Sequence, residues 1–167
     1  VVGELALEGH TRSIKGALSM ALAARDAGYK GLLVPSENAG EAAVVDEIDV
    51  IPIASLSQAV GFFAGTLDID PHPCQLKELF AEYSNYDLDF ADVRGQDVAK
   101  RALTIAAAGA HNLLMLGPPG SGKTMLAKRL PSILPTLTAE ESIETTRIYS
   151  SLGRLKPGQP LLAVRPF

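Results

Sequence analysis

The chain has 167 residues, of which 47% are apolar and 20% are charged, so it can bury a sizeable core as one or two compact units. Its net charge of −4 argues against a strongly basic nucleic-acid-binding protein. Its single cysteine, Cys74, excludes an internal disulfide framework. Because no apolar run approaches the roughly 18 residues of a membrane span and no signal peptide opens the chain, we expect a cytoplasmic protein without a membrane partner.

The first part of the chain alternates between predicted strands and helices. A half-buried strand over residues 4–9 is followed by a helix over 14–24, with Ser13 as its cap and Gly28 as its stop. The spacing of apolar residues then predicts a strand at 31–34, a helix at 37–46, a strand at 48–53 and a helix at 55–64. In the last helix we expect four residues to face inward: Leu56, Ala59, Val60 and Phe63. This alternation is typical of an α/β fold with at least one parallel strand pair.

The middle of the chain differs in composition from both sides. Residues 67–88 contain two prolines, several acidic residues and only a weak helical run over 76–83, which predicts a linker. After it, an alanine-rich helix is predicted over 96–108, ending at Gly109. A capping box at 138–141 predicts a helix that runs to about Leu152 and stops at Gly153, and a strand is predicted over 161–164.

The most informative stretch is residues 113–131. Four apolar residues at 113–116 predict a short buried strand, and residues 117–124 fit the pattern G-x-x-x-x-G-K-[ST] at every fixed position. A helix is predicted over 125–130, stopped by Pro131. This order of strand, loop and helix is the context that a phosphate-binding loop requires. We call residues 117–124 the phosphate loop.

The residue types in the phosphate loop suit the binding of a nucleotide. Glycines let successive backbone N–H groups point into one concavity, and the start of the following helix adds positive potential there. Lys123 supplies a positive charge for the β- and γ-phosphates, and the Thr124 hydroxyl can join the shell of Mg²⁺. The candidate nucleotide-binding residues are Gly117, Pro118, Pro119, Gly120, Ser121, Gly122, Lys123, Thr124 and Met125, with Thr124 as the candidate metal ligand.

A hydrolase also needs a second acidic residue at the end of another apolar strand. After Thr124 the acidic residues are Glu140, Glu141 and Glu144, in the first turns of a predicted helix, where they suit the capping box and the helix dipole. We therefore assign no catalytic residue and expect the chain to bind nucleotide weakly and hydrolyse it poorly.

Several segments together carry a family resemblance. Residues 89–96 (DFADVRGQ), 106–112 (AAAGAHN) and the phosphate loop closely resemble the magnesium-chelatase-like branch of the AAA+ ATPases. The segments 125–131, 133–135, 148–150 and 165–167 fit the same branch, and within it the chain looks most similar to the YifB/ComM competence protein family. Those proteins join a Lon-protease-like domain to the ATPase module. The resemblance implies that 1–66 is the C-terminal half of the Lon-like domain, 67–88 a linker and 89–167 the start of the ATPase domain.

The resemblance also implies cofactors and partners. ATP and Mg²⁺ are the expected cofactors, and Val93, Gly95 and Gln96 match the segment that borders the adenine. Family members form rings, often hexamers, with ATP between subunits, and ComM-like members are associated with DNA branch migration during natural transformation. The arginine finger, the sensors and the lid would follow Phe167. Because the chain also starts without methionine, we expect a fragment cut at both ends, with any DNA contacts made by other parts.

The Lon-like half raises the question of proteolysis. Alignment with Lon-type proteases places Leu18 where the catalytic lysine would stand, and leucine cannot take a proton from a serine. Lys15 resembles a solvated lysine at a helix start, and the partner serine would precede Val1. We expect this chain not to be a protease.

Two histidines and the single cysteine are weaker candidates for a functional site. His72 and Cys74 lie in a proline-rich segment without a second pair of ligands at zinc spacing, so an exposed loop is favoured over a metal site. His111 precedes the predicted loop strand, where a structural role is favoured over an approach to nucleotide or to a neighbouring subunit.

Three functions stay open at this point. The first is an ATP-driven ring motor acting on DNA, and the second is an ATP-dependent metal-chelatase-type remodelling subunit. The Lon-like half favours the motor, because chelatase subunits usually begin directly with the ATPase module. The third is a non-catalytic docking or assembly role for the first half, which is compatible with either.

Overall fold

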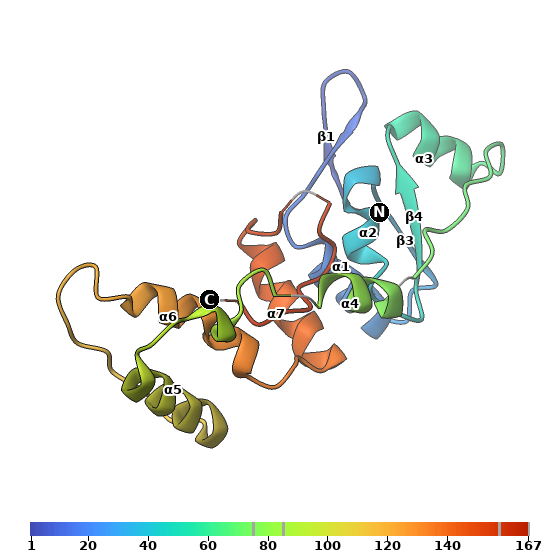
Figure 1. Cartoon of the computed structure of the whole chain (residues 1–167). Helices are drawn as coiled ribbons and strands as arrows, with labels where there is room; N and C mark the ends of the chain where they lie inside the picture. The colour runs from blue at the N-terminus through green and yellow to red at the C-terminus, as the bar shows by residue number, and fades with distance from the viewer. Residues whose placement is uncertain (75, 85, 157, 167) are drawn as a thin grey trace.

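The computed structural model describes residues 1–74, 76–84, 86–156 and 158–166. Its first half is built on two parallel strands, β3 (Gly31–Pro35) and β4 (Asp49–Ile53), with Gly31 opposite Asp49 and Pro35 opposite Ile53. Helix α1 (Ala17–Asp26) precedes β3, and α3 (Leu56–Phe63) follows β4, as Figure 1 shows. The predicted mixture of helices with a parallel strand pair is confirmed.

The main core lies between this strand pair and the helices around it. Buried apolar side chains come from α1, β3, β4 and the segment between the strands, and they include Leu18, Ala21, Leu32, Val34, Ala42, Val44, Val45 and Val50. Branched side chains suit the two strands, and the alanines let α1 approach them closely. Burial of these side chains from water is the main force that holds the first half together.

Helix α1 confirms its predicted stop and corrects its predicted start. At its end, Gly28 has a φ of 76°, and the N–H of Tyr29 donates to the carbonyl of Ala24 at 3.0 Å, a Schellman motif. At its start, the helix begins at Ala17 after Gly16, not at residue 14, and Ser13 is not its cap. The cause is Asn38, whose side chain binds both the N–H and the carbonyl of Ile14 at 2.9 Å and so holds residues 13–16 outside the helix.

Two other predicted elements of the first half are shorter than expected. The strand predicted over 4–9 is reduced to β1 (Glu4–Leu5), which pairs with β2 (Thr11–Arg12) in an exposed hairpin, so the prediction of a half-buried strand was wrong. The helix predicted over 37–46 is a 3₁₀ turn, η1 (Ser36–Asn38), followed by α2 (Ala39–Ala42). The β-branched pair Val44 and Val45 disfavours its continuation and is buried in a turn instead.

Helix α3 is correctly capped but largely uncovered. The Ser55 hydroxyl accepts from the N–H of Gln58 at 3.3 Å, as a cap residue should. Of the four residues expected to face inward, only Ala59 is buried, against Leu33, Ile51 and Ile53. The expectation was wrong for Leu56, Val60 and Phe63, which are 50%, 59% and 67% exposed. The described residues provide no layer that would cover this face of α3.

The second half has a smaller core of its own. Helix α4 (Leu76–Tyr83), as predicted, precedes it, and its Leu76, Leu79 and Phe80 pack against the main core. Beyond it, η2 (Phe90–Asp92), α5 (Asp97–Gly109), α6 (Lys123–Arg129) and η3 (Leu130–Ile133) surround a cluster of four buried residues. These are Phe90, Val93, Leu103 and Leu126. The Ser132 hydroxyl ties η2 to η3 by accepting from the N–H of Phe90 at 2.9 Å and donating to the carbonyl of Arg129.

The strand predicted before the phosphate loop is not formed. Residues 113–116 have no strand partner among the described residues, and Leu114 and Leu116 are 81% and 85% exposed. A β-strand is stabilised by hydrogen bonds to a neighbouring strand, and the described residues place none beside this segment. The prediction of a buried strand here was therefore wrong, although Met115 does pack against the small core.

Helix α7 (Ala139–Ser151) joins the two halves. Its predicted capping box is present, with Thr138 and Glu141 each bonding the other's backbone, and it lies beside α1 in Figure 1. Three small polar residues on its inner face, Ser142, Thr146 and Ser150, are at least 97% buried. The Ser150 hydroxyl donates to Glu41, whose carboxylate also accepts from the N–H of Leu18 at 3.0 Å.

The segment after α7 completes the main core. No strand forms over the described residues 161–164, contrary to prediction. Instead the backbone of Leu162 bonds to α7, donating to Thr146 at 2.9 Å and accepting from Ser142 at 2.6 Å. This holds the side chain of Leu161 fully buried in the main core. Among the described residues, no helix is long and apolar enough to cross a bilayer.

Candidate functional site

The phosphate loop is an exposed turn that leads directly into α6. Gly120 and Gly122 have φ values of 79° and 85°, a left-handed region in which glycine is favoured over other residues. Gly122 is the cap of α6, and its carbonyl accepts the first helical bond, from Leu126, at 3.0 Å. Both prolines of the loop, Pro118 and Pro119, are exposed. The turn thus favours glycine at one fixed position of the motif, Gly122, and at one variable position, Gly120.

Lys123 folds back over the loop that precedes it. Its ammonium donates to the carbonyls of Gly117 and Pro118, both at 2.8 Å, and to the Ser121 hydroxyl at 3.2 Å. These three acceptors match the three N–H donors of an ammonium. A phosphate that enters the loop must therefore replace these neutral oxygen acceptors with charged ones, an exchange that favours the charged partner.

Thr124 and Met125 follow in the first turn of α6, both exposed. Within the described part of the chain, the Thr124 hydroxyl makes no hydrogen bond. It is therefore available to a ligand of the loop, such as a hydrated Mg²⁺. The methyl group of Met125 lies near Gly122, 3.4 Å from where a Cβ of that residue would stand.

The three residues expected at the adenine take different positions. Val93 is 2% exposed in the small core, and its carbonyl accepts from the ammonium of Lys100. Gly95 and Gln96 form a left-handed turn, with φ values of 66° and 56°, that opens α5. Of the three, only Gln96 lines the cavity beside the phosphate loop.

This cavity has a volume of about 550 Å³ and lies between the start of α5 and the phosphate loop. One part of its wall is polar, with Gln96, Asp97, Ser121 and Lys123. The other part is apolar and is formed by Val98, Ala99, Ala102, Leu126 and residues 113–116. A cavity with a cationic end and an apolar end suits an amphipathic anion such as a nucleotide.

Sequence reasoning missed part of this wall. Asp97 is the one carboxylate among the residues that line the cavity, and the helix pattern gave it no role beyond the first turn of α5. Val98, the next residue, is 86% exposed and forms part of the apolar wall. Both follow Gln96 directly, and this adjacency was the signal available in the sequence.

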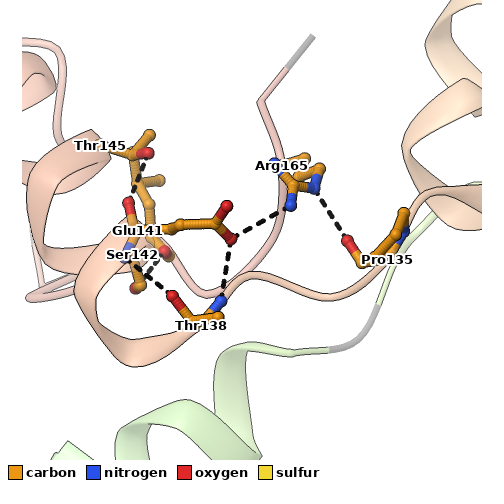
Figure 2. Close-up of polar contacts among 7 residues, drawn as sticks. Pro135, Thr138, Glu141, Ser142, Thr145 and Arg165 are labelled. Carbon is orange, nitrogen blue, oxygen red and sulfur yellow. Dashed lines mark hydrogen bonds and ion pairs between the residues drawn. The ribbon is translucent and has the colours of Figure 1, made fainter. Parts of the chain in front are cut away.

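The acidic residues of α7 lie away from the phosphate loop. Figure 2 shows the Glu141 carboxylate between the N–H of Thr138, at 3.0 Å, and the guanidinium of Arg165, at 3.1 Å. Arg165 also donates to the carbonyl of Pro135 at 2.8 Å. Glu140 and Glu144 are exposed, and neither lines the cavity beside the phosphate loop. The cap and the Arg165 ion pair account for Glu141.

The weaker candidates lie away from the loop cavity. The ring of His111 packs on Gly109 and lines a second cavity, of about 680 Å³, together with Arg165. The Cys74 thiol donates to Asp46 at 3.0 Å, and partial burial, followed by this hydrogen bond, raises the pKa of the thiol. Among the described residues, no three histidine, cysteine or acidic side chains are grouped to hold a metal ion.

The two residues considered for proteolysis lie in different environments, one buried and one exposed. Leu18 is fully buried in the main core, while Lys15 is exposed and its side chain lies over Gly153. The buried position therefore carries no ionisable group.

Comparison with known proteins gives matches to both ends of the chain. The family model described as magnesium chelatase, subunit ChlI, matches residues 89–167, and a second one, described as subunit ChlI of Mg-chelatase, matches residues 1–38. The first of these regions contains the phosphate loop, and the second contains the hairpin, α1 and β3.

Three relatives illustrate the similarity of the whole chain. An uncharacterised protein of Mycobacterium tuberculosis is 40% identical over 176 residues, which cover 100% of this chain and 32% of the relative. The competence protein ComM of Haemophilus influenzae is 43% identical over 150 residues, 89% of this chain and 29% of the relative. YifB of Escherichia coli is 38% identical over 168 residues, 100% of this chain and 32% of the relative. The chain thus spans about a third of the length of these relatives.

Proposed function

Because the chain belongs to the YifB/ComM family of magnesium-chelatase-like proteins, we propose that it supplies the ATP-binding part of an AAA+ ring ATPase. The observation that carries this proposal is the position of Lys123. Its ammonium lies over the phosphate loop, held by two carbonyls at 2.8 Å, beside a cavity with a polar and an apolar end.

The residues present fit Mg-ATP. The ammonium of Lys123 and the backbone N–H groups of the loop bind the phosphates, and the free hydroxyl of Thr124 joins the shell of Mg²⁺. The apolar wall at Val98, Ala99 and residues 113–116 packs against the base. The carboxylate that lines this cavity, Asp97, belongs to the first turn of α5 and not to the end of a strand, so in this proposal hydrolysis relies on other parts of the complete protein, in a ring of several copies.

We further propose that the complete ring moves DNA. The family resemblance, which associates ComM-like members with DNA branch migration, supports this role, and the name of the Haemophilus influenzae relative, a competence protein, agrees with it. The alternative is a remodelling subunit of the metal-chelatase type, which the description of the matched family supports. A docking or assembly role for the first half is compatible with either function.

The first test is a titration of this chain with Mg-ATP that follows both binding and phosphate release. We expect binding that is lost in Lys123→Ala, with negligible turnover, because the lysine is the main positive charge at the loop. Lys128→Ala is the matched control, since Lys128 is an exposed lysine on the same helix. If the unchanged chain does not bind Mg-ATP, or if both variants bind equally well, the proposal is wrong.

The second test distinguishes the DNA motor from the chelatase-type subunit and uses the complete protein. A motor that acts on DNA should hydrolyse ATP faster when DNA is added, whereas a chelatase-type subunit should respond to its protein partner instead. A hydrolysis rate that is the same with and without DNA would count against the DNA motor.

A further inference from the structure

Gln96 adopts an unfavourable backbone conformation next to the proposed nucleotide site. It is one of three residues other than glycine with a positive φ among the described residues, at 56°, and it follows Gly95, at 66°. A side chain in this region crowds its own carbonyl, so the conformation persists only where the surroundings enforce it. Here the two residues turn the chain sharply into α5 and direct the Gln96 side chain toward the phosphate loop.

The amide of Gln96 lies directly against the loop. Its Nε2 is 2.7 Å from where a Cβ of Gly122 would stand, so the amide occupies the space directly beside that glycine. Gly122 adjoins Lys123, and Gln96 and Lys123 line the same cavity. In the described part of the chain, the Gln96 amide makes no hydrogen bond, although it is a strong donor. A free donor therefore stands beside the lysine that meets the phosphates.

The same cavity offers a different surface to a base. Its apolar wall, formed by Val98, Ala99 and residues 113–116, has no side-chain hydrogen-bonding group and suits an aromatic ring. The amide of Gln96 instead touches the residue next to Lys123. Resting on the ATP-binding function proposed above, we propose that Gln96 is a further binding residue whose side-chain amide donates to the polyphosphate of the nucleotide and not to its base.

The test compares two probes, Mg-ATP and inorganic Mg-triphosphate, by calorimetric titration at fixed ionic strength. Gln96→Ala removes the donor, and Gln96→Glu keeps the shape but places a negative charge near the phosphates. Gln58→Glu on α3 is the matched control, because its side chain serves as an acceptor, for the N–H of Ala54, and a carboxylate keeps that role. Figure 1 shows α3 well away from α5 and α6.

We expect Gln96→Ala to lower the affinity for both probes by the same factor, about tenfold, as for the loss of a hydrogen bond to a charged group. Gln96→Glu should weaken both further, by repulsion, and the control should bind as the unchanged chain does. Because Gln96 is exposed, each variant should unfold at a temperature close to that of the unchanged chain.

Two results would overturn the inference while leaving the ATP-binding function in place. The first is a loss of affinity for Mg-ATP in the Gln96 variants with unchanged affinity for Mg-triphosphate, which would assign the amide to the base or the ribose. The second is no loss for either probe in these variants, although Lys123→Ala abolishes binding. If the unchanged chain binds neither probe, the ATP-binding function is wrong, and this inference with it.

Discussion

The region around β3 and the region before the phosphate loop bury their apolar side chains to very different extents. Leu32, Leu33 and Val34 of β3 are 6%, 5% and 0% exposed. Leu114 and Leu116, which belong to the similarly apolar run 113–116, are 81% and 85% exposed. The difference lies in the surroundings, because β3 has β4 beside it and α1 above it, whereas residues 113–116 have no strand partner in the described chain. An apolar run in the sequence therefore becomes buried only where other elements of the fold pack against it.

The largest effect should come from truncating a leucine in each region. Leu18→Ala should lower the free energy of unfolding by about 2–5 kcal/mol, because the side chain is fully buried and leaves a cavity. Leu114→Ala should change it by no more than about 0.5 kcal/mol, because that side chain is already in water. Urea denaturation followed by circular dichroism measures both. Losses of similar size would contradict the contrast between the two regions.

A smaller effect should show that the well-packed region extends to α7. Glu41→Ala leaves the N–H of Leu18, the amide of Asn38 and the buried hydroxyl of Ser150 without this acceptor. We expect a loss of about 1–3 kcal/mol in the free energy of unfolding. Glu37→Ala, a change at a nearby exposed glutamate, is the control in the same denaturation experiment. If the two variants lose the same stability, the Glu41 contacts do not hold α7 in place.

The smallest effect should come from the ion pair in Figure 2. Arg165→Gln removes the contact with Glu141 at 3.1 Å, between side chains that are 29% and 48% exposed. Because water screens such a pair, the loss should be below about 1 kcal/mol and should shrink as salt is added. Arg147→Gln, at an exposed arginine of α7, provides the control for the change in net charge. A loss that is large and independent of salt would indicate that Arg165 stabilises the chain in another way.

Local signals in the sequence were sufficient where a few neighbouring residues decide the structure. The Gly28 stop of α1 and the capping box at Thr138 both follow from side-chain and backbone hydrogen bonds within five residues. Gly120 and Gly122 of the phosphate loop belong to the same class, and they take the left-handed conformations that its curvature needs.

The failures concern contacts between distant segments. The helical pattern of α3 identified an apolar face but not whether another layer covers Phe63. Nothing near Leu161 in the sequence indicates that it enters a core formed mainly by residues 18–50. In the candidate site, the motif identified Lys123 and Thr124, while the placement of Asp97 in the same cavity depends on how α5 packs beside the loop. Such contacts depend on the arrangement of whole elements in space.

The position of Leu161 has a practical consequence for anyone who divides the chain. The two matched family models would invite a cut between residues 38 and 89, with each piece produced alone. The first piece would then lack the leucine that fills its core, and the second would carry that leucine in water, with the polar face of α7 uncovered beside it. Each piece should therefore be less soluble than the intact chain. When mixed, the two should reassociate by fragment complementation.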